Sequence, residues 1–424
     1  MAHPLHHITR LDNGLVIVTA SLPHMASVSV GVWAAVGGRH ESAPLNGVAH
    51  FIEHMLFKGT RRRSAERISQ DVEGIGGYLN AFTSEEHTCF YSKALADRLD
   101  DLVDVLFDML RHSRFDPADI RREREVIREE VAMYLDQPQQ HVQELFNEIM
   151  WPDHSLGRPL TGTLASIARI GRRDLLTFLT ANYTAPAIVV AAAGALEHAA
   201  VVDAVRRRTG RMSTAPRPRP EPTPAERRAA SVRLVSKATE QSQIALGFRT
   251  CSRHDRRRFA VRLLNIVLGE NMSSRLFQII REDRGLAYSI YSSPSFWDDV
   301  GDLVISAGLD AGKIEPVIRL VWRELRRLAT VPIGRDELRR AKDYALGQID
   351  LALENTENHM MWLGEQLVSS GQLLPISKAK DQLARVTAVQ IQAAARDFLG
   401  PERCALAAVS PLRSERVLWR ALAA

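Results

Sequence analysis

The stretch NGVAHFIEHMLFKGT, residues 46–60, combines an apolar segment with two histidines and a glutamate. Pro44 and Asn46 stand at its start, and both residue types favour the beginning of a helix. Gly59 follows the apolar segment and offers a stop, because glycine adopts the left-handed conformation that ends many helices without strain. The sequence therefore predicts a helix of about three turns between these residues.

Three polar residues share one face of this predicted helix. His50 and His54 are four residues apart, and Glu53 follows His50 by three. Two imidazoles one turn apart can hold a metal ion, most naturally zinc, with the glutamate within reach of a water on it. The order H-x-x-E-H is the H-E-x-x-H constellation with the chain direction reversed. Taken alone, the pair also fits a helix with two hydrogen-bonded histidines, so a third ligand is needed.

A second predicted helix, DPADIRREREVIREEVAMYLDQP at residues 116–138, offers that ligand. Its Asp-Pro start and Asp-Gln-Pro end are typical helix boundaries. Glu123 and Glu130 are seven residues apart, which is two turns, so they point the same way. Alone, this is typical of a charged surface helix. Beside a helix with two histidines it indicates a carboxylate ligand, with Glu129 as a rival and the stripe shared with Glu123 favouring Glu130.

These segments carry a resemblance to a known family. GVAHFIEHMLFKGT, GGYLNAFTSEEHT and SSRLFQIIREDRGLAYSIYS resemble signature stretches of the pitrilysin family of zinc peptidases, in particular the mitochondrial processing peptidase β-subunit and its bacterial relatives. The resemblance covers essentially the whole chain. It implies that His50, His54 and Glu130 bind one zinc ion per chain and that Glu53 activates water. It also implies that Glu123 supports catalysis without being a ligand.

The residue types agree with metal-assisted hydrolysis of a peptide bond. Zinc held by two imidazoles and one carboxylate lowers the pKa of its bound water to about 7. Glu53 can then take the proton and return it to the leaving amine. The sequence contains no G-x-S-x-G elbow and no phosphate-binding loop. We therefore expect a zinc-dependent endopeptidase acting on extended peptides or presequences.

The chain is expected to form two domains, because 424 residues exceed the usual size of one hydrophobic core. A Pro-rich linker at residues 213–230 separates a zinc-binding catalytic half, residues 1–212, from a metal-free half, residues 231–424. Strand and helix patterns recur in the same order on both sides, but the second copy lacks H-x-x-E-H. The predicted fold is α+β, with two tandem copies of one unit, each a mixed sheet covered by helices, facing across a cleft as the resemblance implies.

Substrate binding is expected from both halves. In the first, the resemblance gives Asn80, Ala81 and Thr83 this role, and the polar–apolar alternation of LNAFTSE suits an edge strand that an extended peptide could join. In the second, Arg281 at a helix end and Tyr288 at a strand start are donors that the resemblance places near the scissile bond.

Two aromatic residues of the metal helix complete the candidate substrate site. Phe51 and Phe57 flank the metal-binding face and are candidates to line a side-chain pocket, although core packing is expected for at least one of them.

Composition excludes several other classes of protein. The net charge of +5 is scattered, without a basic arm for nucleic acid, and the sequence has no apolar run of about eighteen residues to cross a membrane. The N-terminus lacks a signal-peptide core and is expected to be exposed and without function, so we expect a cytoplasmic protein. Three widely spaced cysteines are predicted to be reduced thiols.

The assembly follows from the resemblance. Pitrilysin-like single chains contain four such units and this chain has two, which implies a homodimer or a heterodimer with a related metal-free chain. Two alternatives to a peptidase are a non-catalytic or partner-dependent subunit, which would lack a complete site, and a small-molecule lyase such as S-ribosylhomocysteine lyase, which is a single short unit.

Overall fold

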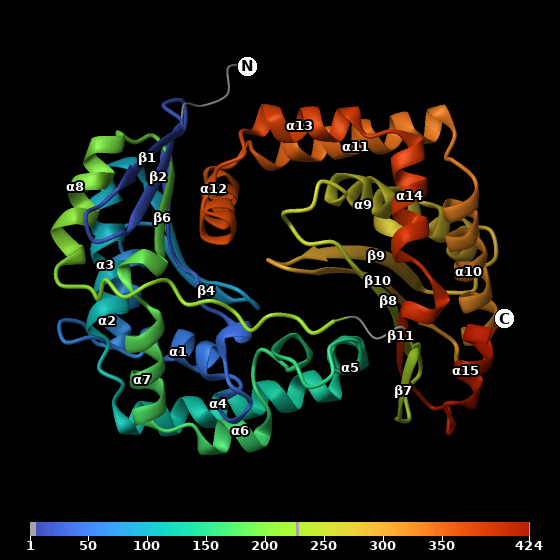
Figure 1. The fold of residues 1–424 in the computed structure, drawn as a ribbon. Helices are drawn as coiled ribbons and strands as arrows, with labels where there is room; N and C mark the ends of the chain where they lie inside the picture. The colour runs from blue at the N-terminus through green and yellow to red at the C-terminus, as the bar shows by residue number, and fades with distance from the viewer. Residues whose placement is uncertain (1–5, 226–228, 424) are drawn as a thin grey trace. The chain divides into compact units, whose positions relative to one another are not determined.

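The computed structural model describes residues 6–225 and 229–423 (Figure 1). The chain divides into two compact units, and neither is a continuous stretch of sequence. The first consists of Met1–Val131, Arg158–Glu221 and Asp350–Pro375, and the second of Ala132–Gly157, Pro222–Ile349 and Ile376–Ala424. The division at residues 221 and 222 falls inside the predicted linker, but each unit also takes a segment from the other half of the sequence.

Within the described ranges, the first unit contains a mixed sheet of six strands in the order β1-β2-β6-β3-β5-β4. The strand order makes β1 and β4 the two edges of the sheet. Within it only the β2–β6 pair is parallel. The strands are β1 (His6–Arg10), β2 (Val16–Ser21), β3 (Ser27–Ala34), β4 (Tyr78–Thr83), β5 (Thr88–Leu95) and β6 (Ile188–Gly194).

One face of this sheet packs against most of the first unit's helices and forms its main core. These helices are α1 (Val48–Leu56), α2 (Ala65–Glu73), α3 (Leu99–His112), α4 (Pro117–Asp136), α6 (Leu164–Arg169), α7 (Arg172–Asn182) and α8 (His198–Thr209). The predicted alternation of β3 is confirmed, because Val28, Val30 and Val32 all point into this core and Trp33 points to the opposite face.

That opposite face is covered by α12 (Thr356–Ser370), which comes from the C-terminal half of the sequence. Its buried Met360 and Leu363 join a separate apolar cluster with residues of β2, β3 and β6. The close approach depends on two glycines. A Cβ at Gly31 would come within 2.4 Å of the Met360 sulfur, and a Cβ at Gly364 within 2.0 Å of the Trp33 ring.

In the described residues of the second unit, five strands form a mixed sheet in the order β7-β11-β8-β10-β9. They are β7 (Ser231–Ser236), β8 (Ser242–Thr250), β9 (Ser289–Phe296), β10 (Gly301–Leu309) and β11 (Cys404–Ser410). Helices around its main core are α9 (Arg258–Asn265), α10 (Ile314–Thr330), α11 (Arg335–Ala352), α13 (Ile376–Arg385), α14 (Ala388–Phe398) and α15 (Arg416–Ala423), and α9 continues into a π-helical turn, Ile266–Glu270.

The other face of the second sheet is covered by α5 (Pro138–Met150), which comes from the N-terminal half of the sequence. Phe146 of α5 is fully buried, and a Cβ at Gly247 of β8 would come within 2.5 Å of its ring. The two units thus exchange one covering helix each, α5 for α12.

The predicted repeat is confirmed by topology. The order β2-β6-β3-β5-β4 in the first sheet matches β7-β11-β8-β10-β9 in the second, with one parallel pair at the same place. Two strands were not predicted. The N-terminal residues His6–Arg10, expected to be an exposed end, pair with β2 as β1, and Gly301–Leu309 forms β10.

The Pro-rich segment contributes to neither sheet. Residues 213–225 form no helix or strand, and residues 226–228 lie outside the described ranges. Glu221, in the middle of this segment, is held to the first unit, where the guanidinium of the buried Arg39 donates to its carbonyl at 2.7 Å. Among the residues that the structure describes, no helix is both long and apolar enough to span a bilayer.

Candidate metal and catalytic site

The helix that carries the two histidines, α1, starts later than its sequence indicated. Asn46 does not cap it; Gly47 precedes the first turn with φ of 90°. The buried carboxylate of Glu41 instead accepts hydrogen bonds from the backbone N–H groups of Gly47 (2.7 Å) and Ala49 (2.8 Å). A negative charge at this end also interacts favourably with the helix dipole. The helix ends at Leu56, three residues before the predicted stop at Gly59.

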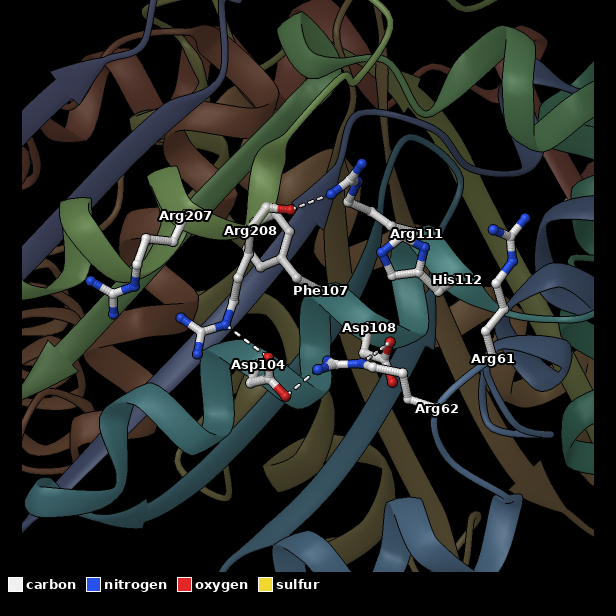
Figure 2. A pocket seen from close by; sticks show the side chains of 9 residues that line it. All are labelled: Arg61, Arg62, Asp104, Phe107, Asp108, Arg111, His112, Arg207 and Arg208. Carbon is white, nitrogen blue, oxygen red and sulfur yellow. Dashed lines mark hydrogen bonds and ion pairs between the residues drawn. The ribbon is translucent and has the colours of Figure 1, made fainter.

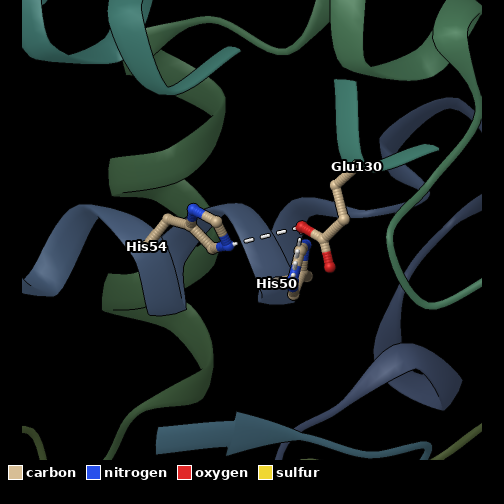
Figure 3. Close-up of side chains that lie close together, drawn as sticks. All are labelled: His50, His54 and Glu130. Carbon is tan, nitrogen blue, oxygen red and sulfur yellow. Dashed lines mark ion pairs between the residues drawn. The ribbon is translucent and has the colours of Figure 1, made fainter. Parts of the chain in front are cut away.

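His50, His54 and Glu130 meet at one point within the first unit (Figure 3). One carboxylate oxygen of Glu130 lies 3.7 Å from Nε2 of His50 and 3.7 Å from Nε2 of His54. The three possible ligand atoms all lie within 4.8 Å of one another. Contacts of 3.7 Å are too long for hydrogen bonds. These groups therefore face one another at ion-pair distance, without a hydrogen bond between them.

The donor set fits zinc. Two bonds of about 2.0–2.2 Å from one ion span up to about 4.4 Å between the ligand atoms, which accommodates the 3.7 Å separations. Burial, reinforced by the neighbouring His54, lowers the pKa of His50 to about 3. A neutral imidazole is the form that binds metal. Two nitrogens and one carboxylate oxygen with both imidazoles on one helix match the donor set of a catalytic zinc site.

Glu123 holds one of the histidines in place. Its Oε2 lies 3.2 Å from Nδ1 of His54, and its Oε1 lies 2.9 Å from Nζ of Lys58. Burial alone would raise the pKa of Glu123, but its hydrogen bonds with His54 and Lys58 lower it. A carboxylate on Nδ1 fixes the tautomer of the ring and leaves Nε2 for the metal. The sequence-based role of Glu123, support without ligation, agrees with this geometry.

Glu53 lies on the same helix and contacts the edge of the sheet. The hydroxyl of Thr83, the last residue of β4, donates to Oε2 of Glu53 at 2.6 Å. Burial raises the pKa of Glu53, while the bond from Thr83 opposes the shift. A carboxyl group with a raised pKa is suited to accept and release a proton near neutral pH. A candidate base thus stands between the ligand histidines and an edge strand.

Comparison with known proteins identifies the family. Residues 16–164 match the description "Insulinase (Peptidase family M16)", and residues 169–344 match "Peptidase M16 inactive domain". The chain belongs to peptidase family M16. Its predicted resemblance to the pitrilysin-type zinc peptidases is thereby confirmed, and the second match agrees with the absence of H-x-x-E-H from the second half.

Two bacterial relatives of the M16 chain align over almost its full length. It is 38% identical over 417 residues to an uncharacterised zinc protease of Streptomyces coelicolor, which covers 96% of this chain and 90% of that protein. It is 35% identical over 405 residues to the uncharacterised zinc protease YmxG of Bacillus subtilis, with 94% and 97% coverage.

Solved structures confirm the predicted α+β fold of two tandem units. A protease from Helicobacter pylori matches with a TM-score of 0.91 at 21% identity, covering 96% of this chain and 100% of that one. A peptidase M16 inactive domain from Pseudomonas fluorescens matches with a TM-score of 0.86 at 19% identity, covering 96% and 99%.

The direction of the side chains on helix α4 distinguishes Glu129 from Glu130 as the candidate metal ligand of the M16 chain. Its bounds, Pro117 to Asp136, agree with the predicted ones. Glu129 is exposed, whereas Glu130 is half-buried and faces the histidines. Arg124, on the same helix, donates to the backbone oxygens of Ile167 (3.1 Å) and Ile170 (2.7 Å).

The predicted substrate residues fall into two groups. Asn80, Ala81 and Thr83 lie on β4, which is an edge strand as expected, and the N–H of Ala81 donates to the Asn80 side chain at 2.8 Å. Phe51 has no exposed surface and packs in the main core, so the prediction that it lines a pocket is wrong. Phe57 is half-buried, and its role stays a prediction.

Arg281 and Tyr288 belong to the second unit. Arg281 lies in the π-helical segment Phe277–Glu282, where its guanidinium stacks over the Phe277 ring at 4.8 Å. Tyr288 directly precedes β9, as its sequence indicated, and is 60% exposed. Both side chains are accessible to a ligand, and their contact with substrate stays a prediction.

Two residues of the site were missed by sequence reasoning. Lys58 follows His54 by four residues, just beyond the end of α1, and this spacing could have suggested it. Glu41 is seven residues before Val48, the first residue of α1, and reaches the helix through a loop, so no helical spacing indicates it.

Proposed function

We propose that this chain is a zinc-dependent endopeptidase that cleaves extended peptides or presequences. The observation that supports it best is the position of Glu53. This carboxyl group is on the helix of His50 and His54 and is hydrogen-bonded to Thr83 at the end of an edge strand. A base near a metal-ligand set and beside a strand edge is the arrangement that peptide hydrolysis requires.

His50, His54 and Glu130 would hold the ion, and Glu123 keeps His54 oriented. Zinc in such a site supplies a water of lowered pKa and polarises a carbonyl oxygen. Glu53 accepts the proton of the attacking water and passes it to the nitrogen of the leaving amine. The raised pKa of Glu53 favours the first of these transfers, because it makes the carboxylate a stronger base.

The substrate class is supported by β4. Its only partner in the described sheet is β5, so its other side is available for a peptide in an extended conformation. Main-chain hydrogen bonds to Asn80, Ala81 and Thr83 would hold such a peptide with little regard to its side chains. Arg281 and Tyr288 would add donors for the carbonyl oxygens of the substrate.

Location and assembly are part of the proposal. Cys89, Cys251 and Cys404 are buried free thiols, which agrees with a reducing compartment such as the cytoplasm. We also propose a dimer, either of identical chains or with a related metal-free chain.

A cleavage assay tests this function. A pool of peptides 10–30 residues long, incubated with zinc-loaded wild type and with Glu53→Gln, would be analysed by mass spectrometry. We expect cleavage by the wild type and a loss of at least about 100-fold in Glu53→Gln, which lacks the base. Glu66→Gln, an exposed substitution on α2, is the matched control and should cleave normally.

The outcomes separate the alternatives. Equal cleavage by wild type and Glu53→Gln would contradict the role of Glu53. If zinc binds but no protein cleaves, the chain is a non-catalytic or partner-dependent subunit, and the peptidase proposal for the chain by itself fails.

A further inference from the structure

A pocket lies in the first unit, and the candidate metal ligands are not among its lining residues (Figure 2). It has a volume of about 440 Å³ and lies between α3, α8 and the segment that follows α1. Its described lining residues are Arg61, Arg62, Asp104, Phe107, Asp108, Arg111, His112, Arg207 and Arg208. Five arginines against two aspartates leave this lining with three excess positive charges.

The acidic residues of the pocket are fully engaged. Asp104 pairs with Arg62 at 2.9 Å, Arg63 at 2.6 Å and Arg208 at 3.0 Å. Burial would raise the pKa of Asp104, but the three guanidiniums hold it at about 2. Asp108 likewise pairs with Arg62 and Arg63. These carboxylates are therefore ionised and shared among several cations. Asp100, just outside the lining residues, likewise pairs with Arg207 at 2.7 Å and with Arg208 at 2.6 Å.

Two of the arginines have no carboxylate partner among the described residues. Arg61 is exposed, and Figure 2 shows its guanidinium on the opposite side of the pocket from Arg207. Arg111 donates to the backbone oxygen of Arg208 at 2.5 Å, and burial lowers the pKa of its guanidinium. A partly buried, unpaired guanidinium is costly unless an anion approaches it.

His112 is surrounded by the same positively charged arginines. It is the last residue of α3 and lines the pocket beside Arg111. Burial lowers its pKa, and the charges of Arg111, Arg61 and Arg62 lower it further against the opposing effect of Asp108. A neutral imidazole can donate one hydrogen bond to an anion oxygen.

We propose that this pocket, between Arg61, Arg111, His112 and the Arg207–Arg208 pair, binds the phosphate groups of a small phosphorylated molecule. Guanidinium groups present forked donors that match phosphate oxygens in pairs. A volume of about 440 Å³ is within the range of small-molecule sites. Several donors from three chain segments surround one space, which favours a compact group with several negative oxygens over a single carboxylate.

The test uses the full-length protein and inorganic tripolyphosphate, with binding measured by isothermal titration calorimetry. We expect one site per chain in the wild type and affinity lowered about tenfold in Arg61→Gln, because one charge-assisted contact is lost. Arg61 is exposed and has no acidic partner in the described residues, so its substitution should leave the fold unchanged. Arg173→Gln, an exposed substitution on α7, is the matched control and should bind like the wild type.

Three results would overturn the proposal. The first is no binding by the wild type, and the second is equal loss in Arg61→Gln and Arg173→Gln, which would indicate unspecific attraction to a basic protein. The third is tighter binding of a poly-glutamate peptide than of tripolyphosphate, which would assign the pocket to an acidic protein segment.

A vesicle-binding experiment distinguishes a phosphorylated lipid from a free phosphorylated molecule. Flotation with phosphatidylcholine vesicles containing phosphatidylinositol phosphate should not retain the protein if the ligand is a free molecule. Retention of wild type but not Arg61→Gln, without tripolyphosphate binding, would overturn the small-molecule assignment. Glu53→Gln should bind tripolyphosphate like the wild type, because Glu53 does not line this pocket.

Discussion

Glu129 and Glu130 show how one position on a helix separates a candidate ligand from a surface residue. They are adjacent in sequence and chemically identical, yet only Glu130 faces both imidazoles at 3.7 Å. Glu129 is exposed on the same helix. Since consecutive helical residues point about 100° apart, only one of the two can face α1.

This pair gives a direct test of the ligand set. Glu130→Gln should reduce zinc affinity by more than the roughly 10- to 100-fold that loss of an outer-shell partner costs. Glu129→Gln should bind zinc like the wild type, because its side chain is directed to solvent. Affinity would be measured by competition with a fluorescent zinc chelator. Equal losses in the two variants would contradict the assignment of Glu130.

Sequence reasoning reached the residues whose relation is local. His50, Glu53 and His54 lie within two turns of one helix, so spacing alone places them together. The bond from Thr83 to Glu53 could not be predicted in this way, because it depends on how β4 packs beside α1. Phe51 was misjudged because an aromatic residue next to a ligand is apolar whether it lines a pocket or fills the core.

At the scale of the element, the start of α1 depends on one buried carboxylate. Glu41 is 4% exposed. Its carboxylate accepts hydrogen bonds from two backbone N–H groups and from the side-chain amide of Asn46 (3.2 Å). Burial raises the pKa of Glu41 to about 7, with these hydrogen bonds opposing the shift. The helix that presents the histidines therefore begins at a group that titrates near neutral pH.

A pH dependence of stability follows. The pKa of Glu41 is raised from 4.5 to about 7 in the folded protein. Its contribution to the stability of the fold is therefore full below pH 4.5 and is lost as the pH rises through 7. Between pH 5 and 8 the free energy of unfolding of the wild type should fall by about 2.5 kcal/mol relative to that of Glu41→Gln, which does not titrate. Urea unfolding of both proteins at the two pH values measures this. A difference that stays constant with pH would contradict the raised pKa.

Most elements could be predicted from period and boundary residues, and the exceptions have physical reasons. The helix α4 was predicted from its Asp-Pro start and Asp-Gln-Pro end. The strand β10 was missed because all its residues are buried, so it shows no alternation. The strand β1 was missed because it is polar and short and is held at a sheet edge by its pairing with β2.

At the scale of the whole molecule, the exchange of α5 and α12 could not be read from the sequence. An apolar helix face indicates burial, but it does not indicate which sheet will cover it. Both helices cover the sheet of the unit formed mainly by the other half of the chain. Two continuous domains were therefore the natural expectation.

Matched core substitutions would reveal the exchange. Leu363→Ala, in the C-terminal half of the sequence, should destabilise the first unit by about 2–5 kcal/mol. Phe146→Ala, in the N-terminal half, should destabilise the second unit by about 3–5 kcal/mol. Hydrogen exchange measured by mass spectrometry should show loss of protection in β3 and β6 for the first variant, and in β8 and β11 for the second. The reverse pattern would contradict the segment assignment.

The exchange also means that a cut in the peptide backbone would not part the two units. A protease that nicks the Pro-rich segment leaves α12 attached to C-terminal residues but packed on the first sheet, and α5 attached to N-terminal residues but packed on the second. Two fragments ending and beginning in that segment, produced together, should therefore complement each other into one particle. Either fragment alone would carry a sheet with one bare apolar face and a helix without its sheet.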